Sequence, residues 1–327
     1  WDTLGARPYP YPQAARPWDA DAFLAAVEAE DEAAAIAAMR GALRDGVARE
    51  EIGRTLGRAA LSHYADFGHS AIYVRKSREL AAALGPEAQL PLMLALVRSL
   101  VAATREDRLP EFRGYAAALA AWQGGGAAPA RARDFIGLPV PAALTRTLQS
   151  AGRDPREIYD ALLGAAAWNL LHFDLDADRA TDNAVADNVS WLDFTHALTF
   201  ANAARPICEA QPDLWPRALL QLALFIGRNK AYVKAQQDVA RWRVADVRSF
   251  IADAMAGLFD HGIVEPIIAC HRVKMLFAFE DELATAPDAP WRDAMAAAMN
   301  RWLNTPQKRH HGLRLATQAR DFVAREG

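Results

Sequence analysis

The sequence predicts an all-α fold, a compact bundle of many helices. Three observations lead to this prediction. Apolar residues recur at spacings of three and four along most of the chain, sustained strand-like alternation is absent, and glycine and proline gather in a few segments that would separate helices. With 327 residues, of which 52% are hydrophobic and 24% charged, the chain can bury a large core, either in one domain or in two helical layers.

The first elements follow from local signals. Residues 1–17 contain four prolines, which favours an extended arm and prevents an early helix. Asp19 is a suitable cap for a helix that runs to about Glu30, and a second helix is expected over Asp31–Asp45, before Gly46. A third begins near Ala48, where two glutamates fall in its first turn.

The remaining helices are predicted from apolar periodicity. They are expected within Leu90–Ala103, Phe112–Trp122, Ile158–Leu171, Leu214–Ile226, Val247–Phe259 and Ile263–Phe279. Three consecutive glycines and two closely spaced prolines make residues 124–154 rich in predicted loop. We therefore expect a single helical domain over 18–327, with 124–154 as its candidate sub-boundary.

Charge and composition exclude several classes of function. The net charge is −3 and the sequence pI is about 6.3, with basic and acidic residues interleaved, so nucleic acid is not an expected partner. No segment is long and apolar enough for a membrane span, and no signal peptide is recognisable, which favours the cytoplasm. The chain begins at Trp1 instead of methionine, so a preceding segment or domain is an open expectation.

Common catalytic motifs are also absent. The chain has no G-x-S-x-G, no G-x-x-x-x-G-K-[ST], no H-E-x-x-H and no G-x-G-x-x-G after a strand. Its two cysteines form no C-x-x-C pair, which excludes the usual thiolate metal sites.

Histidines carry the strongest chemical signal in the sequence. Six of the eight are flanked by apolar or aromatic residues, and a neutral imidazole in such surroundings is a typical transition-metal ligand. Each one taken alone is also compatible with a hydrogen-bonded core histidine. The six are His63, His69, His172, His196, His261 and His271.

The first histidine group lies at residues 62–76. On an unbroken helix His63 and His69 would face different directions, but Gly68 permits a bend that would bring them together. Asp66 precedes His69 by three residues, the spacing at which a carboxylate can orient an imidazole. The alternative is ordinary helix packing around Gly68. Neighbouring aromatic residues that would line a substrate pocket are Tyr64 and Tyr73.

The second group runs from His172 to His196. Asp193 stands three residues before His196, again as a possible orienting carboxylate or as a plain helix contact. Trp191, next to this group, is a third candidate for the substrate pocket.

The third group pairs His271 with Lys274, three residues later on the same face of an apolar helix. A lysine in such a place must reach water, pair with an acid or lose its charge. A neutral lysine beside a metal can take up carbon dioxide and offer a carbamate oxygen as a ligand. The alternative is a salt bridge to an acid among residues 280–282.

These dispersed features resemble the questin oxidase-like family of helical, metal-dependent oxygenases. The resemblance rests on buried-looking histidines in successive helices, on the segment Trp191–Thr199 and on the late His271-x-x-Lys274. It implies a mononuclear non-haem iron, a carboxylated lysine, dioxygen, an aromatic or other apolar substrate and a Rieske-type or other electron donor. The ligands that the resemblance assigns are His63, His69, His172, His196, His271 and Lys274.

The sequence therefore leads to three functional hypotheses. The first is the iron-dependent oxygenase just described. The second is a zinc-dependent hydrolase that uses the same histidines. The third is a metal-free helical interaction or scaffold protein, in which the histidines belong to the core and the proline-rich arm is a docking segment. All three agree on the fold, and the first two depend on whether His69, His196 and His271 converge.

Overall fold

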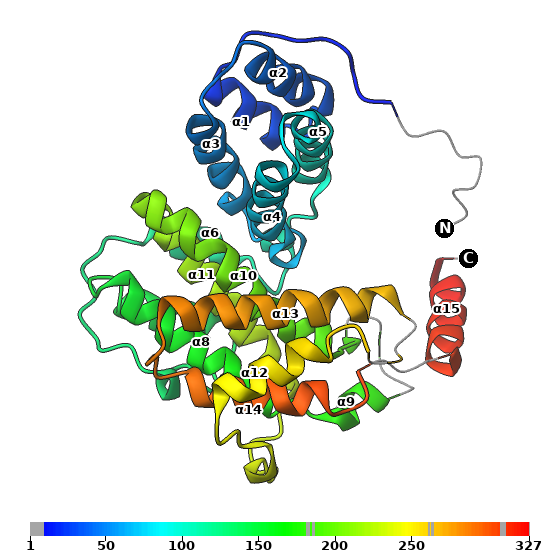
Figure 1. The fold of residues 1–327 in the computed structure, drawn as a ribbon. Coiled ribbons are helices and arrows are strands. Elements are labelled where there is room, and N and C mark those ends of the chain that lie inside the picture. The colour runs from blue at the N-terminus through cyan, green and yellow to red at the C-terminus, as the bar shows by residue number, and fades with distance from the viewer. Residues whose placement is uncertain are drawn as a thin grey trace. The chain divides into compact units, whose positions relative to one another are not determined.

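The chain folds into α-helices joined by turns and short 3₁₀ segments, as a computed structural model shows (Figure 1). The structure describes residues 10–180, 184, 187–260, 262, 265–307 and 312–326. Within those ranges it has no strand, only the isolated bridges Ala65–Arg105 and Phe173–Val233. The predicted all-α class is confirmed. His261, one of the six histidines singled out in the sequence, lies outside the described residues.

Contacts between residues divide the chain into two compact units. Unit 1 consists of the residues up to Leu109 together with Ala203–Arg217, and unit 2 consists of Pro110–Asn202 and the residues from Ala218 onward. The predicted sub-boundary at 124–154 falls inside unit 2.

Unit 1 is built from five helices and the end of a sixth. They are α1 (Ala20–Glu28), α2 (Glu32–Arg44), α3 (Arg49–Leu61), α4 (His69–Leu84), α5 (Pro86–Ala102) and the last turns of α10 (Trp191–Ala210). α2 packs on α1 and α5, and α4 packs on α3 and α5. Asp19 accepts hydrogen bonds from backbone amides in the first turn of α1, as predicted, and Asp31 caps α2 in the same way.

The predicted arm is extended where the structure describes it. Residues 10–19 contain no helix, as their prolines require. Arg98 stacks on Tyr11 and Arg40 donates a hydrogen bond to the Pro12 carbonyl, so this segment lies against unit 1.

Unit 2 holds most of the other helices. They are α6 (Gly114–Ala120), α7 (Val140–Gln149), α8 (Pro155–Leu171), α9 (Leu175–Arg179), the first turns of α10, α11 (Trp215–Asn229), α12 (Val247–Ala256), α13 (Pro266–Thr285), α14 (Arg292–Leu303) and α15 (Gly312–Glu326). Its most extensive helix pair is α8 with α14, and α13 packs on α12 and α14. The core of the unit is aromatic as well as aliphatic, with Trp191, Trp291 and Trp302 fully buried.

The structure differs from the sequence prediction in the loop-rich stretch 124–154. Residues Val140–Gln149 form α7, with Pro139 as its cap and Pro141 in its first turn. Proline is tolerated there because the first amides of a helix have no intrahelical partner.

No helix among the described residues combines the length and the apolar character that crossing a bilayer demands.

Candidate metal centre

Two histidines of unit 2 meet inside its core. His196 lies on α10 and His271 on α13, one turn after the start of each helix, and they are only 7% and 5% exposed. Their Nε2 atoms are 3.3 Å apart, and the two rings are inclined at 80°. α10 and α13 thus bring together two side chains that are 75 positions apart in the sequence.

Backbone carbonyls fix the tautomer of both rings. Nδ1 of His196 lies 2.5 Å from the Leu192 carbonyl, and Nδ1 of His271 lies 2.6 Å from the Ile267 carbonyl, each one turn earlier on the same helix. A carbonyl oxygen only accepts, so Nδ1 donates in both rings. In the neutral imidazole the proton is then on Nδ1 and the lone pair is on Nε2.

The two Nε2 atoms therefore face each other as acceptors. Two lone pairs at 3.3 Å repel unless a cation, either a proton or a metal ion, lies near both. Zinc–nitrogen bonds of about 2.0–2.1 Å in tetrahedral geometry place two ligand nitrogens roughly 3.3–3.4 Å apart. The observed separation matches the edge of such a coordination polyhedron.

His69 has the same internal arrangement on α4 of unit 1. Its Nδ1 donates to the Asp66 carbonyl at 2.7 Å, so in the neutral ring the lone pair is again on Nε2. His69 belongs to unit 1, whereas His196 and His271 belong to unit 2.

A strained turn sets the position of His69. The predicted bend at Gly68 is present, and α3 and α4 are separate helices on either side of it. Asp66, Phe67 and Gly68 all have positive φ, at 52°, 48° and 81°. Such angles cost free energy for residues other than glycine. His69 then begins α4 and stacks on Tyr73, with ring centroids 5.3 Å apart.

His63 has a different environment from the other histidines. Its Nδ1 is 2.9 Å from Asp107 and its Nε2 is 2.7 Å from Glu28. Carboxylates on both nitrogens favour the imidazolium, so these two acids raise the pKa of His63, Asp107 most strongly. We leave His63 out of the proposed ligands for this reason.

His172 follows the last residue of α8 in unit 2. It is 6% exposed, stacks on Trp168 and donates from Nδ1 to the Trp168 carbonyl. Burial lowers its pKa, so the ring is neutral at pH 7. His172 is therefore a buried histidine whose proton is on Nδ1, the same tautomer as in His196 and His271.

The two acids predicted to orient histidines lie in different surroundings. Asp193 accepts hydrogen bonds from the backbone amide and hydroxyl of Ser190 and lies 3.4 Å from Arg228, so it caps the start of α10. The Asp66 carboxylate is 3.8 Å from Nδ1 of His69, farther than the carbonyl of the same residue. Backbone carbonyls, which no sequence pattern marks, orient the histidines instead.

Lys274 is one turn beyond His271 on α13. Burial lowers the pKa of its amine to about 8, which increases the neutral fraction at physiological pH.

The three aromatic residues predicted for a substrate pocket differ in their exposure. Tyr64 and Trp191 are fully buried, and Trp191 donates its indole N–H to the Pro306 carbonyl. Tyr73 is 41% exposed.

Comparisons of the chain with models of known families, with curated proteins and with solved structures found no match, so the interpretation of this centre rests on its own residues.

Proposed function

We propose that this chain is a metal-dependent enzyme of the mononuclear non-haem iron oxygenase class. In this proposal His196 and His271 of unit 2 provide two imidazole ligands, and His69, which the resemblance also assigns, is the candidate for a third. The observation that carries it is the pair of buried Nε2 lone pairs that face each other at 3.3 Å. Metal-bound histidines usually donate their other ring N–H to a carbonyl or carboxylate, and all three histidines do so.

Iron, dioxygen and an aromatic or apolar substrate come into the proposal from the resemblance noted in the sequence. Three imidazoles leave coordination positions open, which is what an iron that must bind dioxygen needs. Lys274 is the candidate for a fourth, carboxylated ligand, because its depressed pKa favours the neutral amine that adds to carbon dioxide. A Rieske-type protein is one donor that would supply the electrons.

A zinc-dependent hydrolase is the second candidate, and one observation favours it. The 3.3 Å separation of the two Nε2 atoms fits a tetrahedral ion, the geometry that zinc prefers. The same ligands would then lower the pKa of a zinc-bound water. Metal identity and oxygen consumption distinguish the two candidates.

Metal analysis tests the proposal directly. Protein purified without chelator or histidine tag, and reconstituted anaerobically with Fe²⁺, is expected to hold about one equivalent of iron. His196→Ala and His271→Ala each remove a ligand and should reduce the bound metal to less than about a tenth of an equivalent. His172→Ala is the matched control, because it removes a buried imidazole of the same tautomer from the same unit and should leave metal binding unchanged.

The competing metal-free interpretation makes a different prediction. If the histidines are only core residues, the wild type holds no metal after reconstitution with iron or zinc. His196→Ala and His271→Ala then each cost roughly 1–3 kcal/mol of stability as ordinary core truncations. A shared ion would make the two losses strongly non-additive in metal-loaded protein.

A further inference from the structure

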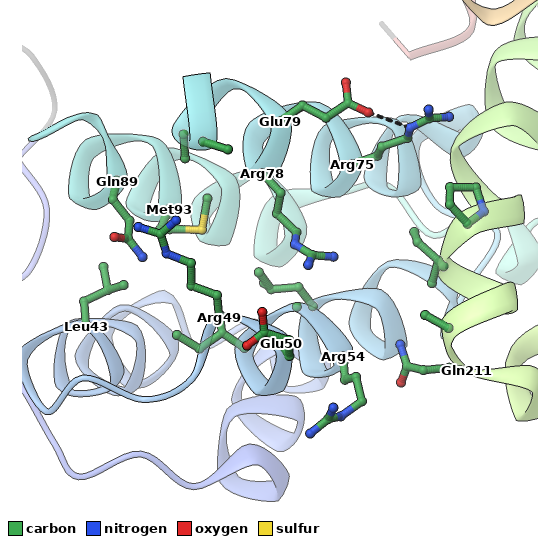
Figure 2. Close-up of a pocket in the computed structure, with 18 residues that line it drawn as sticks. Leu43, Arg49, Glu50, Arg54, Arg75, Arg78, Glu79, Gln89, Met93 and Gln211 are labelled. Carbon is green, nitrogen blue, oxygen red and sulfur yellow. Dashed lines mark hydrogen bonds and ion pairs between the residues drawn. The ribbon is translucent and has the colours of Figure 1, made fainter. Parts of the chain in front are cut away.

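Unit 1 contains a cavity of about 580 Å³ that none of the functional hypotheses uses (Figure 2). It opens between α3 and α4, with residues of α5 and of the end of α10 completing its wall. Its volume lies within the roughly 300–1,000 Å³ that is usual for small-molecule sites.

The base of the cavity is apolar. Four of its lining side chains are buried hydrophobic residues of α3, α5 and α10, with between 0% and 7% of their surface exposed: Ile52, Leu56, Met93 and Ile207. Binding of a hydrocarbon chain against these side chains is favourable, and the free energy of binding scales with the apolar area removed from water.

The rim of the cavity is basic. Four arginines and two glutamates line it, so positive charge is in excess. Glu79 is already paired with Arg75, at 2.7 Å. The guanidinium groups of Arg49 and Arg78 have no hydrogen bond or ion pair with any residue that the structure describes. Arg78 extends from α4 toward α3, and Arg49 extends from α3 toward Gln89 and Met93 of α5 (Figure 2).

A glycine makes room for one of these guanidinium groups. A Cβ at Gly53 of α3 would lie 2.6 Å from Cζ of Arg78, closer than carbon atoms can approach. A side chain at residue 53 would therefore displace the Arg78 guanidinium from its present place over α3. Its position beside the apolar base depends on that gap.

We propose that this cavity binds a small amphipathic anion, an aliphatic chain with a carboxylate or phosphate monoester head. Guanidinium pairs with either head through two parallel hydrogen bonds, which makes Arg78 the anchor, with Arg49 as a second charge. The aliphatic chain covers Ile52, Leu56 and Met93. The proposal uses residues of unit 1 alone and does not depend on the metal centre.

Calorimetry with defined probes tests it. Octanoate and octyl phosphate are titrated into the full chain below their micelle concentrations, with 1-octanol and inorganic phosphate as partial ligands. At least one of the two amphiphiles is expected to bind with a Kd below about 1 mM, and the pair shows which head is preferred. 1-Octanol lacks the charge and inorganic phosphate lacks the aliphatic chain, so each is expected to bind at least tenfold more weakly.

Three variants test the assigned residues. Arg78→Gln is expected to weaken binding about tenfold or more, because it removes a charge-assisted contact. Gly53→Ala should weaken binding as well, since the methyl group displaces the guanidinium, while Tm rises because alanine is the better helix former. Arg54→Gln is the matched control, since Arg54 also lines the cavity from α3 but points away from the other arginines (Figure 2).

Each other outcome overturns the proposal. If 1-octanol binds as tightly as the anions, the cavity is only an apolar groove. If Arg54→Gln weakens binding as much as Arg78→Gln, the attraction is general surface charge. If neither amphiphile binds at millimolar concentration, there is no such site.

Discussion

Glu106 is a carboxylic acid buried beside the left-handed turn of unit 1. It is only 2% exposed, and it accepts a hydrogen bond from the backbone amide of Phe67. Burial raises the pKa of Glu106 to about 7, although that hydrogen bond acts in the opposite direction. The folded protein therefore keeps a proton on this group at pH values where an unfolded chain has lost it.

This difference makes stability depend on pH. Between about pH 4.5 and 7 the folded state binds more protons at Glu106, so its contribution to stability is complete below that interval and is lost as the pH rises. Glu106→Gln stays neutral throughout. We expect the difference in unfolding free energy between variant and wild type, measured in urea at pH 5 and pH 8, to change by roughly 2–3 kcal/mol in favour of the variant. A difference that stays constant between the two pH values would contradict the assigned burial.

The histidines show how far single residues can be predicted from sequence. Apolar neighbours correctly indicated that His172, His196 and His271 are buried, because helical periodicity places such positions in a core. The same reasoning could not find the carboxylates around His63. Glu28 and Asp107 are 35 and 44 residues away in sequence, and only the packing of unit 1 brings them to the ring.

At the scale of elements, a side chain of α14 completes the end of α8. The buried Arg301 donates to the carbonyls of Leu171 and Phe173, at 2.6 and 2.8 Å, where α8 has no further turn to satisfy them. Burial lowers the pKa of Arg301 to about 10, so it is still charged at neutral pH. The arginine joins the two most extensively packed helices of unit 2.

Removing this arginine should destabilise unit 2. Arg301→Met keeps the volume but removes the charged donor from both carbonyls, which leaves Leu171 with only the 3.3 Å hydrogen bond from Gln237, and we expect a loss of about 2–4 kcal/mol in urea unfolding. Arg320→Met is the control. Arg320 is exposed on α15 and pairs with its neighbour Asp321, so that variant should change stability by less than about 0.5 kcal/mol. Equal effects of the two variants would rule out the bridging role of Arg301.

The sequence predicts helices well where apolar periodicity extends over many residues. It predicts them less well where glycine and proline are frequent. α8 and α12 begin within three residues of their predicted starts, and Asp19 caps α1 as expected. The sequence does not predict α7, because the prolines around it also fit a loop. A proline marks the first turn of a helix as readily as a break, and only the following residues distinguish the two.

For the molecule as a whole, metal binding and thermal stability should be linked. An ion that binds the folded chain and not the unfolded one stabilises it by RT ln(1 + [L]/Kd), about 2.7 kcal/mol at one hundred times Kd. We expect Tm to rise as Fe²⁺ or Zn²⁺ is added under anaerobic conditions, and His271→Ala to abolish the rise. Calorimetric scans of metal-loaded and chelator-treated protein provide the measurement. A Tm that is the same with and without metal would argue against the centre.

The all-α class followed from composition and periodicity, whereas the convergence of α10 and α13 could not be predicted. Periodicity fixes which face of a helix is buried, but it does not say which other helix that face meets. His196 and His271 were both recognised as candidates, yet their 3.3 Å approach depends on the packing of helices far apart in sequence.

The left-handed turn ahead of His69 implies a trade between stability and precision. Holding Asp66 and Phe67 at positive φ costs roughly 1–2 kcal/mol for each residue, and that free energy must come from packing elsewhere in unit 1. A glycine in place of Phe67 would relieve the strain, but it would also give the backbone more conformational freedom just before His69, the first residue of α4. Selection for higher stability and selection for a fixed orientation of the His69 imidazole would therefore favour different residues at position 67.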